Sequence, residues 1–342
     1  YYFILDEAQY IKNQSTKNAQ TVKLINGKYR FALTGTPIEN SLAELWSIFD
    51  FLMPQYLFNY HYFQKQYESS IVKNNDEEKT KQLKKLVTPF ILRRNKKEVL
   101  KELPDKIEQN MILPFSDEEE KIYVANLAKV NEELQQLYDI EGSDKMQILK
   151  MLTRLRQLCL EPRLVYDNID QPSSKLKACM ELIKTMQENK QKVLLFSSFT
   201  SALDLIAEEC QKAGITYYML TGSTNKEERR ELVSRFQKDD TTLFLISLKA
   251  GGTGLNLTSA ENVIHYAPWW NVSAQNQATD RAYRIGQKSN VQVFNLVMKD
   301  SVEEKIIEMQ KRKKELADMF VENNSGGLSQ MSKEDILSLF TM

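Results

Sequence analysis

The sequence predicts an α/β protein with two parallel sheets, the first incomplete, and a helical insertion between them. Three observations support this fold class. Short apolar segments alternate with amphipathic ones near both ends of the chain, as strands and helices do around a parallel sheet. The middle of the chain lacks this alternation and is typical of long helices. The length, 342 residues, exceeds one ordinary domain and is right for two.

The first predicted elements are a strand, a helix and a second strand. Residues 1–5 are apolar and are followed by acids, which predicts a buried parallel strand. Ser15 or Thr16 can cap a helix that runs to about Ile25. Residues 29–33 then form the second strand. This order is typical of a parallel α/β sheet.

A long helical region follows and then the α/β alternation returns. Residues 42–164 predict an all-helical support region with prolines as breaks. Ser301 is expected to cap a last helix that ends near Phe320. The predicted strands of the second half are 193–196, 216–220, 243–246, 263–266 and 291–297, and the predicted helices before the last are 200–213 and 225–237. The expected domains are 1–57, the end of a first lobe; 58–172, a helical protrusion and linker; 173–320, a complete second lobe; and 321–342, a mobile tail.

Composition excludes several classes of protein. Hydrophobic residues make up 42% and charged residues 27%, as in globular proteins, and the formal net charge is zero, which argues mildly against a nucleic-acid coat protein. Three cysteines without CxxC spacing and two distant histidines argue against a structural zinc site. No apolar segment is long enough to cross a membrane, so we expect no membrane partner.

Two adjacent acids follow the first predicted strand. Asp6 and Glu7 would lie at its carboxyl end, where open parallel sheets bind ligands. One carboxylate can hold Mg²⁺ and the other can orient and deprotonate an attacking water, although a solvated turn is the more common explanation of such a pair. Thr34 and Thr36 follow the second strand, so their hydroxyls would lie beside the carboxylates, or they simply form a strand-ending turn.

Two segments of the second half have residues that can contact phosphates. Ser223 and Thr224 can offer hydroxyls or helix N-terminal amides, or they form an ordinary capped turn. Residues 247–257 include three glycines in four positions, and the N–H groups of such a loop can cradle phosphate oxygens.

Arg281 and Arg284 are the candidate cations for a transferring phosphoryl group. Their spacing predicts one face of a helix capped by Asn271 or Ser273. Guanidinium groups match the charge spread over a transferring phosphoryl group. Two ordinary surface arginines are the alternative.

These segments resemble the motifs of the Swi/Snf-type ATPases, the double-stranded DNA translocases of helicase superfamily two. Residues 6–9 (Asp-Glu-Ala-Gln) and 33–40 resemble motifs II and III, 193–199 motif IV, 247–257 motif V, and 277–287 motif VI. Residues 91–94, 103–106 and 155–159 match as well, so the resemblance spans nearly the whole chain in the family's order. It implies two RecA-like lobes, ATP and Mg²⁺ as cofactors, and double-stranded DNA as partner.

The resemblance also implies roles for single residues. Asp6 supports Mg²⁺ and Glu7 activates water. The residues implied in ATP binding are Asp6, Glu7, Gln9, Gly254, Arg281 and Arg284. Those implied in nucleic-acid binding are Thr34, Thr36, Ser223, Thr224, Lys249, Gly251, Gly252, Thr253, Trp270, Arg93 and Arg94. A solvated basic helix face is the alternative for Arg93 and Arg94, and core packing is expected for one tryptophan of Trp269-Trp270.

Departures from the family's pattern favour a bacterial or archaeal member. They include Gln9 where eukaryotic members often have His, Ala267 where Asp is frequent, and Val272 where Pro is common. A prokaryotic member would be cytoplasmic and nucleoid-associated, and a eukaryotic one nuclear. We expect a monomeric motor that acts on DNA-bound proteins such as RNA polymerase or repair factors.

The phosphate-binding loop of the family is not found in the sequence. No Gly-Lys-Thr or Gly-Lys-Ser occurs, and the chain opens on Tyr1 rather than Met. We therefore expect a piece that begins within the first lobe and does not hydrolyse ATP alone. The alternatives are an RNA or strand-separating helicase of the same superfamily, or a non-catalytic DNA-binding relic.

Overall fold

The chain forms two compact units in this computed structural model, which describes residues 1–35, 41–74, 76–92, 94, 96–100, 102–138, 145–251 and 254–321. One unit comprises the described residues up to Leu100 and those from Lys311 onward, and the other comprises the described residues between Lys101 and Gln310. Each unit has its own sheet and its own apolar clusters. Among the described helices, none is long and apolar enough to cross a membrane.

The first unit begins with a parallel pair of strands, as predicted. Strand β1 (Tyr2–Leu5) pairs with β2 (Tyr29–Ala32). Between them lies α1 (Lys17–Lys23), capped by the Thr16 side chain, which accepts a hydrogen bond from the Ala19 N–H. The prediction of a buried β1 is wrong, because Tyr2 is 71% exposed. In the described part this sheet has two strands, and the Phe3 side of β1 is the one that packs on Phe51.

The rest of the first unit is helical, as predicted. Its helices are α2 (Leu42–Leu52), α3 (Tyr60–Phe63), α4 (Ser69–Asn74), α5 (Glu77–Val87) and α6 (Lys96–Val99), with a π-helical turn at Gln64–Glu68 and 3₁₀ turns at Ala8–Ile11 and Thr88–Phe90. Leu45, Phe49 and Phe63 are buried members of its apolar cluster. The periodic apolar positions of α2 therefore supply the face on which the shorter helices pack.

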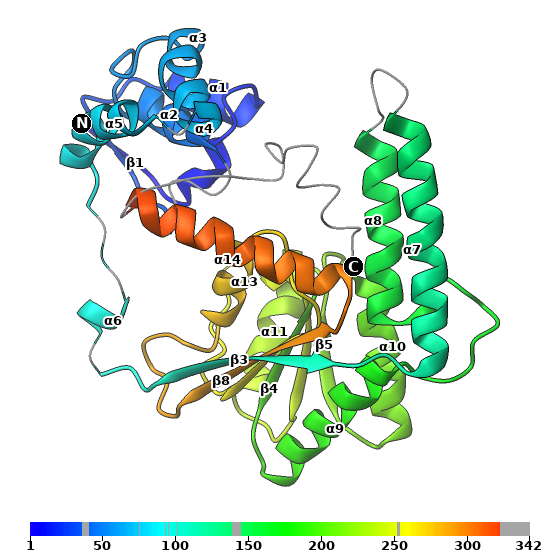
Figure 1. The fold of residues 1–342 in the computed structure, drawn as a ribbon. Coiled ribbons are helices and arrows are strands. Elements are labelled where there is room, and N and C mark those ends of the chain that lie inside the picture. Colours follow the sequence, from blue (N-terminus) through cyan, green and yellow to red (C-terminus); the bar gives the residue numbers. More distant parts are fainter. Residues whose placement is uncertain are drawn as a thin grey trace. The chain divides into compact units, whose positions relative to one another are not determined.

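The second unit is built on a six-stranded, wholly parallel sheet (Figure 1). Its strands are β3 (Lys106–Leu113), β4 (Val193–Ser197), β5 (Tyr217–Leu220), β6 (Leu243–Ser247), β7 (Asn262–His265) and β8 (Val291–Met298), in the order β3-β8-β7-β4-β6-β5. The five strands predicted for the second half are confirmed. Strand β3 is a correction, because it lies in the region predicted to be all-helical. It pairs with β8 along eight residues at the edge of the sheet.

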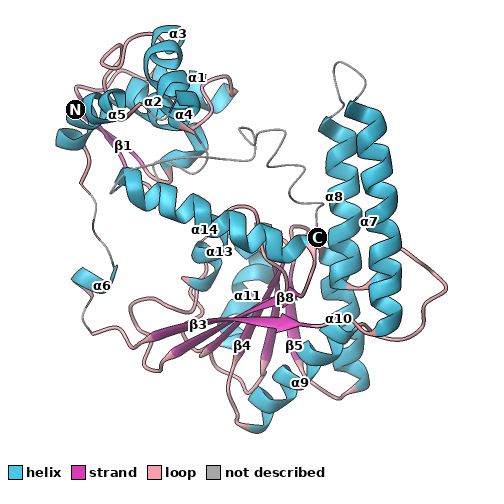
Figure 2. Cartoon of the chain, viewed as in Figure 1, coloured by secondary structure: helices cyan, strands magenta, loops and turns pink. Residues whose placement is uncertain are grey.

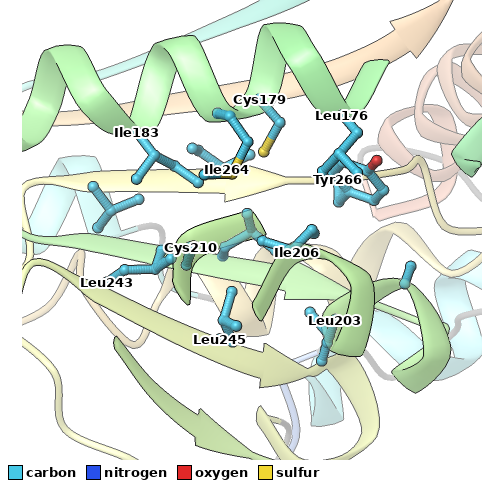
Figure 3. Close-up of a cluster of buried hydrophobic side chains, with 14 of the residues drawn as sticks. Leu176, Cys179, Ile183, Leu203, Ile206, Cys210, Leu243, Leu245, Ile264 and Tyr266 are labelled. Atoms are coloured by element: carbon cyan, nitrogen blue, oxygen red, sulfur yellow. The ribbon is translucent and has the colours of Figure 1, made fainter. Parts of the chain in front are cut away.

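Helices cover both faces of this sheet (Figure 2). They are α9 (Ser174–Glu188), α10 (Thr200–Lys212), α11 (Lys226–Phe236), α12 (Leu248–Gly251), α13 (Val272–Thr279) and α14 (Val302–Val321). Figure 3 shows the core on the α9 and α10 face, where Ile183, Ile206 and Leu245 belong to one buried cluster. The opposite face contributes Leu194, Phe196 and the other alternate residues, as expected for strands buried on both sides.

Two further helices lie between β3 and α9 in the chain. Helix α7 (Asp117–Tyr138) packs on α8 (Lys145–Leu160) as a pair of long helices (Figure 1). The hydroxyl of Tyr123 accepts a hydrogen bond from the Val302 N–H at 2.8 Å and so joins α7 to the start of α14.

A buried ion pair between α9 and α14 also holds the start of α14. The Lys175 Nζ lies 2.7 Å from each carboxylate oxygen of Glu303, and both side chains are at most 1% exposed. The Glu303 carboxylate also accepts the Met298 N–H at 2.9 Å. Helix α9, strand β8 and helix α14 are thus joined at one point.

Candidate functional site

The acid pair lies at the carboxyl end of β1, as predicted. Asp6 and Glu7 are both exposed. The Glu7 backbone is left-handed, with φ 52° and ψ 51°, a conformation uncommon outside glycine. Its N–H donates to the Asp6 Oδ1 at 2.9 Å. A strained backbone of this kind costs energy and is often found where a side chain must be aimed at a ligand.

A short hydrogen-bonded relay connects Glu7 to the end of the neighbouring strand. The Gln9 Nε2 donates to the Glu7 Oε2 at 2.5 Å, and the Thr34 hydroxyl donates to the Gln9 Oε1 at 2.9 Å. The Ala8 N–H donates to the Leu33 carbonyl at 2.9 Å, which holds the two segments together. The structure therefore brings Glu7, Gln9 and Thr34 together, whereas Thr36 lies outside the described residues.

The acid pair fits a magnesium ion that is shared with phosphates and water. Among the described residues, no group of three or more His, Cys, Asp or Glu could hold a metal by itself. Mg²⁺ characteristically takes one or two protein carboxylates and fills its remaining positions with substrate oxygens and water. An exposed aspartate matches that pattern, so Asp6 would be the residue that holds the ion, and the exposed Glu7 beside it stays available to water.

The arginine pair is placed differently from the prediction. Asn271 does cap α13, accepting the Ala274 N–H at 3.1 Å, but α13 ends at Thr279. Arg281 and Arg284 follow it in a series of turns, so their predicted position on a helix is wrong. The Arg281 N–H donates to the Ala278 carbonyl and the Ala282 N–H to the Thr279 carbonyl, both at 3.1 Å, and this three-residue spacing tightens the turn that follows the helix.

The turns after α13 hold the arginines against the glycine-rich segment. The Arg281 Nε donates to the Gly251 carbonyl at 3.0 Å, and the Arg284 Nη1 donates to the Leu255 carbonyl at 3.2 Å. The Leu257 N–H donates back to the Arg281 carbonyl at 2.9 Å. Two segments that were separate candidates in the sequence therefore form one cluster in the second unit.

The glycine-rich segment has a buried part and an exposed part. Gly251 is buried, and a Cβ there would lie 2.8 Å from the Phe196 Cε1, so close packing requires this glycine. Lys249 and Gly254 are exposed, and Gly254 has a φ of 48°, which only glycine adopts readily. Gly252 and Thr253 lie outside the described residues.

The segment before α11 forms a capped turn with an exposed hydroxyl. The Thr221 N–H donates to the Thr224 Oγ1 at 3.1 Å, and the hydroxyls of Thr221 and Ser223 are 2.8 Å apart. Asn225 caps α11. Ser223 is exposed and Thr224 half-buried. Further along α11, Arg229 donates to the Ala250 carbonyl of α12 at 2.6 Å, which joins this helix to the glycine-rich segment.

The remaining candidates lie in two other places. Trp269 packs against an apolar cluster of the second unit, which confirms core packing for one tryptophan, and Trp270 is half-buried. Arg94 is exposed, and Arg93 lies outside the described residues.

Sequence reasoning missed a buried polar network behind the tryptophan pair. The Gln275 side chain donates to the Asn295 Oδ1 at 2.9 Å and accepts the Trp269 N–H at 3.2 Å. Asn295 in turn donates to the Glu108 carboxylate at 3.2 Å, and Gln310 of α14 donates to Gln275 at 3.3 Å. Gln275 on α13 and Asn295 on β8 are buried. A polar residue at a position where the periodicity expects an apolar one was the sequence feature that could have revealed this network.

Two family models match the chain. The SNF2-related domain matches residues 1–164 and the helicase conserved C-terminal domain matches residues 174–286.

Several curated relatives align with nearly the whole chain, across both matched domains. The putative ATP-dependent helicase/translocase YwqA of Bacillus subtilis is 39% identical over 99% of this chain and 37% of its own length. An uncharacterized ATP-dependent helicase of Mycoplasma pneumoniae is 37% identical over 99% of this chain and 32% of its own. The ISWI chromatin-remodeling complex ATPase ISW1 of Saccharomyces cerevisiae is 33% identical over 99% and 31%. The chain thus spans about a third of the length of these relatives.

Solved structures share the fold. The Sulfolobus solfataricus SWI2/SNF2 ATPase core in complex with dsDNA is 34% identical, with 99% of this chain and 72% of that chain covered, at a TM-score of 0.57. The C-terminal part of the Fun30 ATPase domain is 25% identical, with 70% of this chain and 97% of that chain covered, at a TM-score of 0.56.

Proposed function

Because the chain belongs to the SNF2 family of ATP-dependent helicases and has the α/β fold of its ATPase cores, we propose that the full-length protein is an ATP-driven translocase on double-stranded DNA. The observation that carries the proposal is the arrangement of Glu7, whose backbone is left-handed and whose carboxylate is hydrogen-bonded through Gln9 to Thr34. Double-stranded DNA is the proposed substrate because the similar Sulfolobus solfataricus SWI2/SNF2 ATPase core was solved in complex with dsDNA.

On the nucleotide side, Asp6 and Glu7 have different roles. Asp6 holds Mg²⁺, which when bound neutralises charge on the β- and γ-phosphates of ATP. Glu7 orients the attacking water and accepts its proton. Gln9 keeps the Glu7 carboxylate in place, because its amide donates to that carboxylate while its oxygen accepts from Thr34. A displacement of Thr34 at the end of β2 would therefore alter the position of the Glu7 carboxylate.

The arginine cluster supplies positive charge to the transferring phosphoryl group. Arg281 and Arg284 are the proposed fingers, and Gly254 beside them is the proposed nucleotide contact of the glycine-rich segment. Such an arginine contributes roughly 10³–10⁵ in rate in well-studied enzymes. The carbonyl contacts to Gly251 and Leu255 orient both guanidinium groups before ATP arrives.

On the DNA side, the proposed contacts are hydroxyls, backbone amides, cationic side chains and one aromatic ring. They comprise Thr34, Thr36, Ser223, Thr224, Lys249, Gly251, Gly252, Thr253, Trp270, Arg93 and Arg94. Contacts of this kind to the phosphate backbone give little sequence selectivity and a strong dependence on salt. Proteins bound to the same DNA, such as RNA polymerase or repair factors, would be the targets of a monomeric motor, in the nucleoid of a prokaryote or the nucleus of a eukaryote.

The test compares Glu7→Gln with wild type in the full-length protein. We expect ATP binding to be kept and the DNA-stimulated turnover to fall by roughly 10²-fold or more, since the general base is lost. The matched control is Glu118→Gln, an exposed glutamate of α7, which should leave turnover unchanged. Near wild-type turnover in Glu7→Gln would show that Glu7 is not the base.

The same assay separates the rival functions. Double-stranded DNA, single-stranded DNA and RNA are supplied in parallel, and the proposal requires the largest stimulation by double-stranded DNA. Preferential stimulation by RNA would indicate an RNA helicase, and the absence of turnover with every nucleic acid would indicate a non-catalytic relic. The 342 residues alone contain no Gly-Lys-Thr or Gly-Lys-Ser, so we expect no meaningful hydrolysis from them in isolation.

A further inference from the structure

The guanidinium of Arg156 on α8 lies among three aromatic rings. Its central carbon is 5.0 Å from the ring centre of Phe199, 5.1 Å from that of Trp269 and 5.7 Å from that of Trp270. The residue is 6% exposed. Positive charge above an aromatic face is an attractive arrangement, and the attraction grows when water is excluded.

This buried cation is compensated by rings and neutral oxygens. Its Nη2 donates to the Ser198 Oγ at 3.3 Å and to the Pro268 carbonyl at 3.4 Å. Among the described residues, no carboxylate forms an ion pair with it. Burial lowers the pKa of Arg156, and the more distant Glu303 carboxylate partly opposes that change. Removing a charged guanidinium from water costs free energy, so an apolar residue would fill this space at lower cost. We therefore expect a role of Arg156 other than packing.

The backbone between the two tryptophans is held by other helices as well. The Trp269 N–H donates to Gln275 of α13 at 3.2 Å, and its carbonyl accepts from the Gln310 side chain of α14. With Arg156 on the rings, three helices hold this segment. Trp270 is half-buried, and the Arg156 guanidinium is the cation that lies over its ring.

We propose that Arg156 is a positioning residue that holds the Trp270 ring in the orientation in which it contacts the DNA backbone. The inference rests on the proposed function, which makes Trp270 a DNA contact. The fixed ring loses little conformational entropy when DNA binds, because its rotamer is already selected in the free protein. Lysine cannot replace arginine here, since its ammonium is compact and strongly hydrated and does not stack on several rings.

The experiment measures DNA-stimulated ATPase activity of the full-length protein against the concentration of double-stranded DNA. In Arg156→Lys we expect the half-saturating DNA concentration to rise roughly tenfold, equivalent to about 1.4 kcal/mol, with turnover at saturating DNA unchanged. The control is Arg154→Lys on the same helix. Arg154 also lies over a ring, that of Tyr166 at 5.4 Å, but not over a tryptophan, so this variant should behave as wild type.

A double-mutant cycle tests whether Arg156 acts through the ring. If it does, Arg156→Lys has little further effect on the DNA requirement once Trp270→Ala is present. Additive effects would overturn the proposal, as would an unchanged DNA requirement in Arg156→Lys or a loss confined to turnover. If Trp270→Ala alone leaves the DNA requirement unchanged, both this inference and the DNA role of Trp270 fail, while the Glu7 test of the function still stands.

Fluorescence supplies a readout in the 342-residue chain itself. The chain has three tryptophans, so a Trp46→Phe background leaves emission from Trp269 and Trp270 alone. Arg156→Lys should shift the emission to longer wavelength because the rings become more hydrated, and Arg154→Lys should not. An unchanged emission in Arg156→Lys would show that the rings do not depend on Arg156.

Discussion

Replacing Lys175 by methionine would test how strongly the start of α14 depends on one buried ion pair. Methionine has about the length of the lysine stem, so the change removes the ammonium group and leaves little space empty. Glu303 would then keep its buried position, at 1% exposed, without the cation that lies 2.7 Å from both of its oxygens. Only the Met298 N–H would still donate to it among the contacts seen here.

The size of the effect follows from these contacts. Removing one partner of a buried pair costs about 3–5 kcal/mol, because the other charge stays buried without compensation. In the double variant Lys175→Met/Glu303→Leu no charge remains, and the main loss is the acceptor of the Met298 N–H, worth about 1–3 kcal/mol. The double variant should therefore be more stable than Lys175→Met alone.

Urea unfolding followed by tryptophan fluorescence measures these differences. In the 342-residue chain, a Trp46→Phe background restricts the signal to Trp269 and Trp270 and so to the unit that contains the ion pair. An unchanged m value would show that the variants alter stability rather than the surface exposed on unfolding. The matched control is Lys212→Met, whose 65% exposed side chain pairs with Glu209 and should contribute less than about 1 kcal/mol.

Two results would refute this reasoning. A loss below about 1 kcal/mol in Lys175→Met would mean that water or a rearranged side chain compensates Glu303. A double variant less stable than the single one would mean that the carboxylate stabilises the fold through its hydrogen bonds rather than through Lys175.

Two other predictions concern His265 and Gly251. Burial lowers the pKa of His265 to about 4, with the nearby Glu108 carboxylate opposing the change, so the unfolded chain binds this proton at higher pH than the folded one. Stability should fall as pH drops from about 6.5 to 4, by up to about 3 kcal/mol, and His265→Gln should remove that part of the pH dependence of urea unfolding. Gly251→Ala should cost about 1–3 kcal/mol and lower turnover, because its Cβ would lie 2.8 Å from the Phe196 ring beside the carbonyl that Arg281 binds. Gly222→Ala, with nothing within 4 Å, is the control, and equal losses in the two variants would contradict the packing argument.

Features that depend on neighbouring residues in the chain were predictable from the sequence. The predicted caps Thr16 and Asn271 both hold in the structure, because a capping side chain bonds to N–H groups two or three residues ahead. The buried strands of the second sheet were equally clear, since strands covered on both faces are apolar throughout.

Features that depend on distant contacts were not predictable. Strand β3 is polar at Glu108 and Asn110, and its pairing with β8 is invisible to any local pattern. Arg281 and Arg284 have helical spacing, yet hydrogen bonds to the glycine-rich segment hold them in turns. The importance of Arg156 depends on rings that come from other parts of the chain.

The pairing of β3 with β8 also has a consequence for the order of events during synthesis. The two strands lie far apart in the chain, with 185 residues separating Asn110 from its partner Asn295. At roughly 5–20 residues per second, the ribosome needs on the order of ten to forty seconds to make what lies between them. Through that interval β3 has no neighbour to bond with, and an unpaired strand is a template for association with other chains. Its polar side chains, Lys106, Glu108 and Asn110 among them, would keep the nascent strand soluble until β8 emerges and completes the sheet.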